Sequence, residues 1–320
     1  METPTPRHDT VLLSEAIECL MVLPGDTVVD ATIGGAGHFS LFLEKLGKKG
    51  TLVGIDADHD AIERARAVID ALPEATRPKI ILIEDNFTNF TSILAQAGAE
   101  SPDKVLFDLG WSGFQLSRGR GFSFKANEPL LMTYGDPDKA ETTAGDLVNH
   151  LSETSLADMI FSLGEERFAR GIARSIVAAR ESAPIVTTFE LVAAIEAGVP
   201  GWYKHRKLHP ATKTFQALRI AVNDELGALR SGISAALTAL TPGGRVAVIT
   251  FHSIEDRIVK TMFRDAAYAG QGILVSKKPI VPSARELILN PRARSAKLRV
   301  FERGVGAEAI TRSALTSAYV

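Results

Sequence analysis

Val-Val-Asp-Ala-Thr-Ile-Gly-Gly-Ala-Gly-His, residues 28–38, joins an apolar run that ends at Asp30 to a helical pattern over 39–46. Glycines between a strand and a helix let backbone N–H groups approach a ligand without interference from a Cβ. A second apolar run, 51–55, ends in Asp56, which lies 21 residues beyond Gly35 (56 − 35 = 21). A βαβ unit that binds a nucleoside places a carboxylate on the ribose hydroxyls at this separation. The stretch therefore predicts a nucleoside-cofactor site.

The segments around this stretch alternate between strand and helix patterns. We expect strands that end near residues 30, 55, 83, 107 and 251, with helices over 11–21, 39–46, 60–72 and 90–97. Such alternation is typical of an α/β fold with a parallel sheet and helices on both faces. Residues 109–139 are rich in Gly, Ser, Phe and Pro, and 140–200 are strongly helical. We therefore expect residues 1–111 and 213–320 to form the sheet domain, with 112–212 as a helical insertion.

The composition is that of an ordinary soluble globular protein, with 45% hydrophobic and 23% charged residues in a chain of 320. The single cysteine, Cys19, excludes a disulfide framework and a thiolate metal cluster. The first residues show no signal or transit pattern and no apolar run is long enough to span a membrane, which predicts a cytoplasmic protein. Residues 1–110 carry a net charge of −9 (9 − 18) and residues 111–320 a net charge of +7 (27 − 20). The basic part predicts a polyanionic partner, although a solvated basic face explains the charge equally well.

The glycine spacing favours S-adenosylmethionine over a dinucleotide. Gly34-Gly-Ala-Gly37 differs from the Gly-x-Gly-x-x-Gly of a hydride-transfer site. Asp30 or a neighbouring carbonyl would face the cationic methionine end, and Asp56 would take the ribose hydroxyls. Phe87 is placed to stack on adenine, with Asp85 or Asn86 near the amino group; the alternative is a core aromatic.

Asp108 begins the segment Asp108-Leu-Gly-Trp-Ser-Gly-Phe-Gln115, directly after a strand. Ligands of open α/β sheets bind beyond the carboxyl ends of strands. Methylation of an aryl amine needs an acceptor beside the NH₂ group, because hydrogen bonding localises the lone pair and the acceptor later takes the proton. Asp108 is the candidate acceptor, with helix capping or a buried hydrogen bond as the alternative. Trp111 or Phe114 would sandwich a base, with simple packing as the alternative for Trp111.

A third cluster, Thr250-Phe-His-Ser-Ile-Glu-Asp-Arg257, follows the last parallel strand. His252 is a candidate for substrate contact, and Glu255 with Arg257 for a structural pair. Ser253 with Asp256 would cap a helix over 254–264. A hydrolase based on Ser253 and His252 is disfavoured because there is no nucleophile elbow.

Two basic segments, 202–210 and 290–299, interleave or cluster Lys and Arg in a way that fits phosphate contacts and base stacking. His205 and His209 have the i, i+4 spacing of metal ligands, but Pro210 and the lack of a nearby carboxylate favour a polar surface, so we expect no metal. Cys19 precedes the first strand, far from the strand ends. A covalent thiolate route to carbon 5 of cytosine is therefore disfavoured relative to amine methylation.

Ordered motifs along nearly the whole chain resemble one family. They are His8–Leu13, Asp30–His38, Asp56, Asp108–Gly110, Arg120–Phe124, Gly164–Phe168, His209–Thr212, Thr214–Arg219, Phe251–Arg257 and Asn290–Ser295. On these residues the chain is similar to the MraW/RsmH methyltransferases, which methylate the exocyclic N4 of a cytidine in the decoding region of bacterial 16S rRNA. The resemblance implies a Rossmann-like class I methyltransferase sheet with an inserted helical domain that recognises substrate.

The resemblance also implies site residues and partners. Cofactor-binding positions would be Ala36, Gly37, His38, Asp56, Phe87, Asp108 and Gln115. The candidate catalytic residues stay those of the clusters above, Asp108 and His252. The cofactor would be S-adenosyl-L-methionine. The partner would be 16S rRNA or the small ribosomal subunit, with the oligomeric state left open, a dimer included.

The chain departs from the family pattern near the expected methyl acceptor. The usual Val-Ser-Ser-Pro-Gln is Trp111-Ser-Gly-Phe-Gln115, and the usual Pro-Leu-Asp-Met-Arg-Met is Pro129-Leu-Leu-Met-Thr-Tyr134. The usual Gly-x-Gly-Gly-His is Gly34-Gly-Ala-Gly-His38, a change between small residues. These departures favour one alternative, a non-catalytic or diverged S-adenosylmethionine-binding protein that interacts with RNA. A second alternative, independent of them, is a nicotinamide-dependent oxidoreductase.

Overall fold

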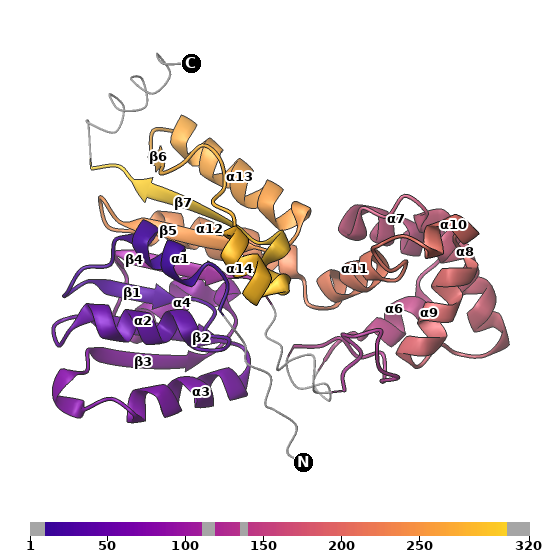
Figure 1. Ribbon diagram of the computed structural model, residues 1–320, viewed down its shortest axis with the longest axis horizontal. Coiled ribbons are helices and arrows are strands. Elements are labelled where there is room, and N and C mark those ends of the chain that lie inside the picture. Colours follow the sequence, from indigo (N-terminus) through magenta and orange to yellow (C-terminus); the bar gives the residue numbers. More distant parts are fainter. Residues whose placement is uncertain (1–9, 111–118, 135–139, 306–320) are drawn as a thin grey trace. The chain divides into compact units, whose positions relative to one another are not determined.

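A computed structural model describes residues 10–110, 119–134 and 140–305 of the chain (Figure 1). The chain divides into two compact units. The sheet unit comprises residues 1–111 and 227–320, and the helical unit comprises residues 112–226. The division at residue 111 coincides with the start expected for the insertion. The helical unit extends to residue 226, beyond the expected end at 212.

Seven strands form one sheet within the described residues, in the order β3-β2-β1-β4-β5-β7-β6. The strands are β1 (Thr27–Asp30), β2 (Thr51–Asp56), β3 (Lys79–Glu84), β4 (Lys104–Asp108), β5 (Arg245–Thr250), β6 (Gly272–Leu274) and β7 (Lys297–Arg303). β1 to β5 are parallel to one another, whereas β7 runs antiparallel to both β5 and β6. The order 3-2-1-4-5 is that of a doubly wound nucleotide-binding sheet. The predicted Rossmann-like α/β fold is confirmed.

Helices cover both faces of the sheet, as the side chains of single strands show. Leu106 of β4 packs in a core with α1 (Leu13–Leu20), α2 (Gly37–Leu46) and α3 (His59–Asp70). The next residue, Phe107, contacts Phe90 of α4 (Phe90–Ala97) and lies beside Gly232 of α12 (Glu225–Ala239). Successive strand residues point to opposite faces. These helices therefore form two layers that enclose strands apolar on both sides.

The last part of the chain contains a helix that the sequence did not predict. Residues 273–303 were expected to form short β-like runs, which is correct for β6 and β7, but α14 (Ala284–Leu289) lies between them. The Ser283 hydroxyl accepts the N–H of Glu286 and caps this helix. Ahead of it, α13 (Ser253–Tyr268) packs Phe263 against Phe301 of β7. The N-cap serine was the missed signal for α14.

The helical unit consists, in the part that is described, of α6 (Ala144–His150), α7 (Glu153–Gly164), α8 (Ala169–Ser182), α9 (Thr188–Ala197), α10 (Gly201–Lys204) and α11 (Thr212–Val222). Capping boxes start α6 at Thr143 and α9 at Thr187. α11 packs so closely on α7 that a Cβ on Gly164 would lie 2.5 Å from the Lys213 carbonyl oxygen. This packing explains why α11 belongs to the helical unit and not to the sheet unit. No helix among the described residues is long and apolar enough to cross a membrane.

A pair of helix ends gives a prediction for stability. Met21 ends α1 in the left-handed region with φ 53° and is exposed, and Gly98 ends α4 with φ 59° and open space around it. A side chain with a Cβ costs about 1 kcal/mol in this region relative to glycine. We expect Met21→Gly to raise the free energy of unfolding by about 0.5–1 kcal/mol and Gly98→Ala to lower it by a similar amount. Urea denaturation measures both, and shifts of the same sign would contradict the explanation.

Candidate functional site

Three carboxylates lie at the carboxyl ends of three adjacent parallel strands. Asp30 ends β1, Asp56 ends β2 and Asp108 ends β4. β1 lies between the other two strands, and Asp30 is in register with Gly54 of β2 and Leu106 of β4. The structure therefore brings together the acidic residues that the sequence predicted for cofactor and methyl acceptor.

The glycine turn before α2 is held directly by Asp56. The N–H of Gly34 donates to Oδ2 of Asp56 at 2.9 Å, and Nε of Arg64 donates to the Gly34 carbonyl at 2.9 Å. Gly37 admits no side chain, because an added Cβ would lie 1.8 Å from Oγ1 of Thr10. Ala36, which caps α2, adopts φ 61°, a conformation that favours glycine. The glycine-rich stretch is thus a tight turn that brings backbone groups to the strand ends.

Asp30 is fully buried and only partly hydrogen-bonded. Its Oδ1 accepts the Thr32 N–H at 3.2 Å, whereas Oδ2 has no hydrogen-bond partner among the described residues. Burial raises its pKa well above the ordinary value, and the nearby carboxylates of Asp108 and Asp56 raise it further. A buried acceptor without a donor is costly. This oxygen fits a cationic or N–H-bearing ligand group.

Asp56 has one hydrogen bond on each oxygen, since Oδ1 also accepts the Asp58 N–H at 2.9 Å. A carboxylate offers about four lone-pair positions. Two acceptor positions are therefore free of these backbone bonds and fit the two hydroxyls of a ribose. Burial raises the pKa of Asp56 to about 6, against the lowering effect of the N–H groups of Gly34 and Asp58.

A hydrogen bond from the Asp108 backbone fixes the position of this residue. Its N–H donates to Oγ1 of Thr32 at 2.6 Å, which fixes the residue at the end of β4. Its Oδ2 lies 3.6 Å from Nδ1 of His38, and its Oδ1 is buried without a hydrogen-bond partner in the described part of the chain. Burial raises the pKa of Asp108 to about 7, and the negative charge of Glu255 adds to the rise while a hydrogen bond from the Gly110 backbone opposes it.

His38 lies beside Asp108 as a neutral ring. Burial lowers its pKa to about 4, and its Nε2 is buried without a hydrogen-bond partner among the residues described. Oδ1 of Asp108, Oδ2 of Asp30 and Nε2 of His38 are thus three buried polar atoms around the same turn. Natural structures rarely leave such atoms unpaired. Their clustering suits a polar ligand at these strand ends.

Phe87 is half-buried, in a 3-10 turn over Phe87–Asn89 after β3. Its ring meets Phe107 edge-on at 5.5 Å between centroids, and its Cδ2 lies 2.8 Å from where a Cβ on Gly232 would stand. The ring therefore packs on the sheet and is not fully buried. The core and stacking interpretations both fit this placement.

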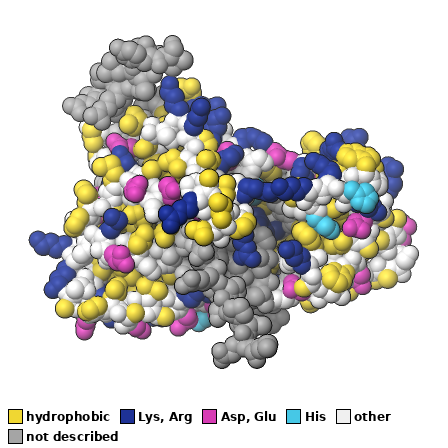
Figure 2. Space-filling view, viewed as in Figure 1, with side chains coloured by type: hydrophobic (Ala, Val, Ile, Leu, Met, Phe, Trp, Pro, Cys, Tyr) yellow, Lys and Arg dark blue, Asp and Glu magenta, His cyan; other side chains and the backbone are white. Residues whose placement is uncertain are grey.

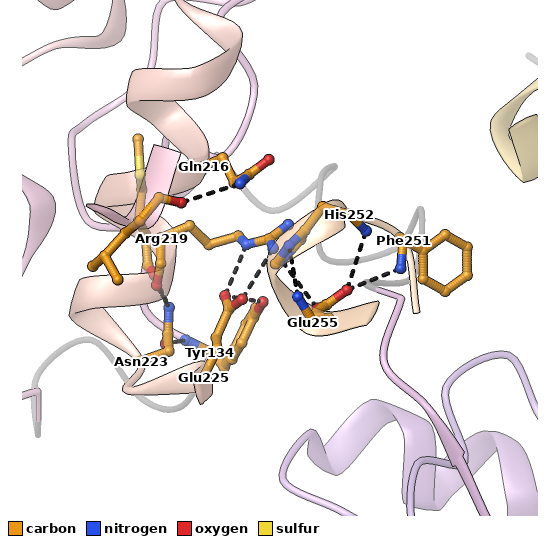
Figure 3. A network of polar contacts seen from close by, with 10 residues as sticks. Tyr134, Gln216, Arg219, Asn223, Glu225, Phe251, His252 and Glu255 are labelled. Atoms are coloured by element: carbon orange, nitrogen blue, oxygen red, sulfur yellow. Dashed lines mark hydrogen bonds and ion pairs between the residues drawn. The ribbon is translucent and has the colours of Figure 1, made fainter. Parts of the chain in front are cut away.

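His252 caps α13, and this differs from the expected cap of Ser253 with Asp256. Nδ1 of His252 accepts the Glu255 N–H at 3.3 Å, and Oε2 of Glu255 accepts the N–H groups of Phe251 and His252 (Figure 3). Asp256 instead binds Lys297 and Arg299 of β7. The Ser253–Asp256 cap was wrong because His252, one residue earlier, takes the N-cap position. A histidine cap needs an unprotonated Nδ1.

The helical unit contains a polar network that the sequence did not predict. Arg219 forms two hydrogen bonds to Glu225, at 2.8 and 2.9 Å, and the Tyr134 hydroxyl donates to the same carboxylate at 2.7 Å (Figure 3). Asn223 accepts the Tyr134 N–H and donates to the Met132 carbonyl. Tyr134 stands in one of the stretches that depart from the family pattern. The network fixes this stretch against the end of α11.

The remaining predicted residues either lie outside the described residues or already have contacts within the protein. His8, Trp111, Phe114 and Gln115 lie outside the described residues. His209 stacks on Phe124 at 4.6 Å, and its Nδ1 accepts the Ala211 N–H, so packing and a turn explain it. In the second basic segment, Lys297 and Arg299 are already paired with Asp256.

A doubly wound sheet with a glycine turn and three carboxylates at adjacent strand ends defines a Rossmann-like enzyme that binds a nucleoside cofactor. The chain belongs to the MraW methylase family, whose model matches residues 5–304. It is 47% identical over 308 residues to the Ribosomal RNA small subunit methyltransferase H of Deinococcus radiodurans, covering 95% of this chain and 92% of the relative. The protein of the same name from Brevibacillus brevis is 42% identical over 319 residues, covering 95% of this chain and 100% of the relative. The cofactor is S-adenosylmethionine, as expected for a methylase with this site.

Proposed function

We propose that this chain transfers a methyl group from S-adenosylmethionine to the exocyclic N4 amine of a cytidine in the decoding region of 16S rRNA. The relatives named as small-subunit rRNA methyltransferases support rRNA as the substrate. The observation that carries the choice of an amine is Asp108. Its buried, unpaired Oδ1 and its pKa of about 7 suit a group that accepts a proton near neutral pH.

In this proposal Asp108 is the residue that accepts the proton from the methylated amine. S-adenosylmethionine, when bound, supplies an electrophilic methyl group on a positively charged sulfur. Asp108 accepts a hydrogen bond from the cytidine NH₂ group, which keeps the nitrogen lone pair out of the ring. It takes the proton that the nitrogen loses once the new N–C bond has formed and the sulfur–methyl bond has broken, which leaves a neutral thioether. It returns the proton to solvent after product release. His38 stays neutral, and its Nδ1 lies 3.6 Å from Oδ2 of Asp108.

The other proposed cofactor positions fit the same site. Asp56 binds the ribose hydroxyls, Ala36 and Gly37 present the turn backbone, and Phe87 lies against the adenine. Asp30 faces the methionine ammonium group with its unpaired Oδ2. Gln115, outside the described residues, remains a proposed cofactor contact. His252 remains a proposed catalytic residue, and its cap geometry supports a positioning role more than a chemical one.

The position of Cys19 supports an amine over carbon 5 as the acceptor. The Cys19 carbonyl accepts a hydrogen bond from Arg245, the first residue of β5. Cys19 therefore lies at the amino end of the parallel strands, whereas the site lies at their carboxyl ends. Its burial also raises the thiol pKa, which disfavours the thiolate that a covalent adduct requires.

The test is transfer of a radiolabelled methyl group to small ribosomal subunits from a bacterial strain that lacks its own enzyme of this family. Mass spectrometry of the digested nucleosides then identifies the product. We expect N4-methylated cytidine. Label in 5-methylcytidine or in another nucleoside would contradict the proposed acceptor. Cofactor binding without any transfer would favour a non-catalytic RNA-interacting protein.

A further inference from the structure

A cluster of aromatic and basic side chains lies in the helical unit, with Trp202 exposed, Phe168 half-buried and Tyr203 buried. It is formed by Arg167 and Phe168, just before α8, and by Trp202, Tyr203 and Arg206, in and after α10. We call these five residues the arginine–aromatic surface. Figure 2 shows Lys, Arg and His side chains gathered over the part of this unit that carries α10.

The rings and guanidinium groups of this surface contact one another closely. The guanidinium carbon of Arg167 lies 4.8 Å from the ring centres of both Phe168 and Trp202, and that of Arg206 lies 5.0 Å from the centre of Tyr203. Trp202 is nevertheless 56% exposed. Such an arrangement holds a large aromatic face in a fixed orientation at the surface.

A buried carboxylate holds this arrangement in place. Glu166 is fully buried; its Oε1 accepts the Phe168 N–H at 2.9 Å and its Oε2 accepts the Tyr203 hydroxyl at 2.6 Å. Burial and this hydrogen bond raise the pKa of Tyr203 to about 12, so the phenol remains a donor. A buried carboxylate that holds Tyr203 beneath the exposed Trp202 is costly unless the arrangement serves a purpose. The surface is therefore preorganised.

The charges of the surface fit a polyanion. Residues 201–213 contain four Lys and Arg and no Asp or Glu. Both arginines are exposed, and among the described residues neither guanidinium group forms a hydrogen bond or an ion pair; each lies beside aromatic rings. Exposed aromatic rings beside free arginines are how proteins bind unpaired nucleotides: bases stack on the rings and phosphates meet the cations.

We infer that the arginine–aromatic surface binds single-stranded RNA, with a base stacked on Trp202 and phosphates at Arg167 and Arg206. The identity of the partner as RNA rests on the proposed function. The surface would bind nucleotides of the substrate other than the methylated cytidine. It would thereby contribute affinity for the RNA and not the chemistry of transfer.

The test is fluorescence anisotropy of a labelled oligouridylate with the full chain, at several salt concentrations. We expect Trp202→Ala to weaken binding about 5- to 100-fold with little change in salt dependence. Arg206→Ala should lower the slope of log affinity against log salt by about 0.7, since one phosphate contact is lost. Matched controls are Phe189→Ala and Arg174→Ala, an exposed aromatic and an exposed arginine of the same unit, which should bind as the unaltered chain does.

Two outcomes would overturn the inference. One is unchanged oligouridylate binding in Trp202→Ala and Arg206→Ala, which would leave an acidic protein as the better partner. The other is an equal loss in the two controls. Trp202→Phe should retain most of the affinity and so separates loss of stacking from loss of folding. Because oligouridylate contains no cytidine and the assay needs no cofactor, failure of the methyl-transfer proposal would not affect the result.

Discussion

Asp108→Asn lowers the rate of methyl transfer by about 10²- to 10⁴-fold, while the affinity for S-adenosylmethionine changes little. This is the expected result because the amide keeps the shape of the side chain but can no longer take a proton. Single-turnover transfer to small ribosomal subunits measures the rate, and calorimetry measures the affinity. Asp265→Asn, an exposed change on α13, is the matched control and should leave both values unaltered.

The pH dependence of the same reaction gives an independent measure. Asp108 has a pKa of about 7 and must be ionised to accept the proton. We expect kcat/KM to rise about tenfold per pH unit below pH 7 and to level off above it, whereas the rate of Asp108→Asn should stay flat. Full transfer by Asp108→Asn, with the same pH profile, would rule out this carboxylate as the acceptor.

The stability of the cofactor-free protein should change in the opposite direction. The pKa of Asp108 is raised on folding, so the folded state binds the proton more tightly than the unfolded state between about pH 4 and pH 7. Stability from this group is present at low pH and is lost as the pH rises through about 7. We therefore expect Asp108→Asn to unfold at a higher temperature than the unaltered chain at pH 8. A lower unfolding temperature would indicate a structural role for the charge.

Asp56→Asn weakens the binding of S-adenosylmethionine by about 10- to 100-fold. The substitution removes a charged acceptor from the ribose hydroxyls and from the Gly34 N–H that shapes the turn. Calorimetry measures the loss, and kcat at saturating cofactor should fall much less. Glu84→Gln is the matched control, since Glu84 is the neighbour of Asp56 in register on β3 and is exposed.

The affinity of the unaltered chain should also depend on pH. The pKa of Asp56 is about 6, and ribose hydroxyls bind the ionised form. We expect cofactor affinity to fall as the pH drops below about 6 and this pH dependence to be lost in Asp56→Asn, whose amide does not titrate. Tight binding by Asp56→Asn at all pH values would show that the ribose is held elsewhere.

The fold and the acidic part of the site could be predicted because each depends on a local pattern. Strands apolar on both faces ended at Asp30, Asp56 and Asp108, and parallel pairing then brought these ends together. Other features depend on contacts between residues distant in the sequence. Tyr134 meets Glu225 across 91 positions, and α11 joins the helical unit through its packing on α7. The cap at His252 was missed because histidine is an uncommon N-cap residue.

The helical unit lies between β4 and β5 in the chain, and this position affects how the sheet forms during synthesis. β4 ends at Asp108 and its sheet neighbour β5 begins at Arg245, so the whole helical unit must leave the ribosome before these two strands can pair. Until then, a half-built sheet presents β4 as an open apolar edge, the kind of edge through which chains aggregate. A chain that stalls within the helical unit is therefore expected to need a chaperone, whereas one released after β7 has its hydrophobic edge covered.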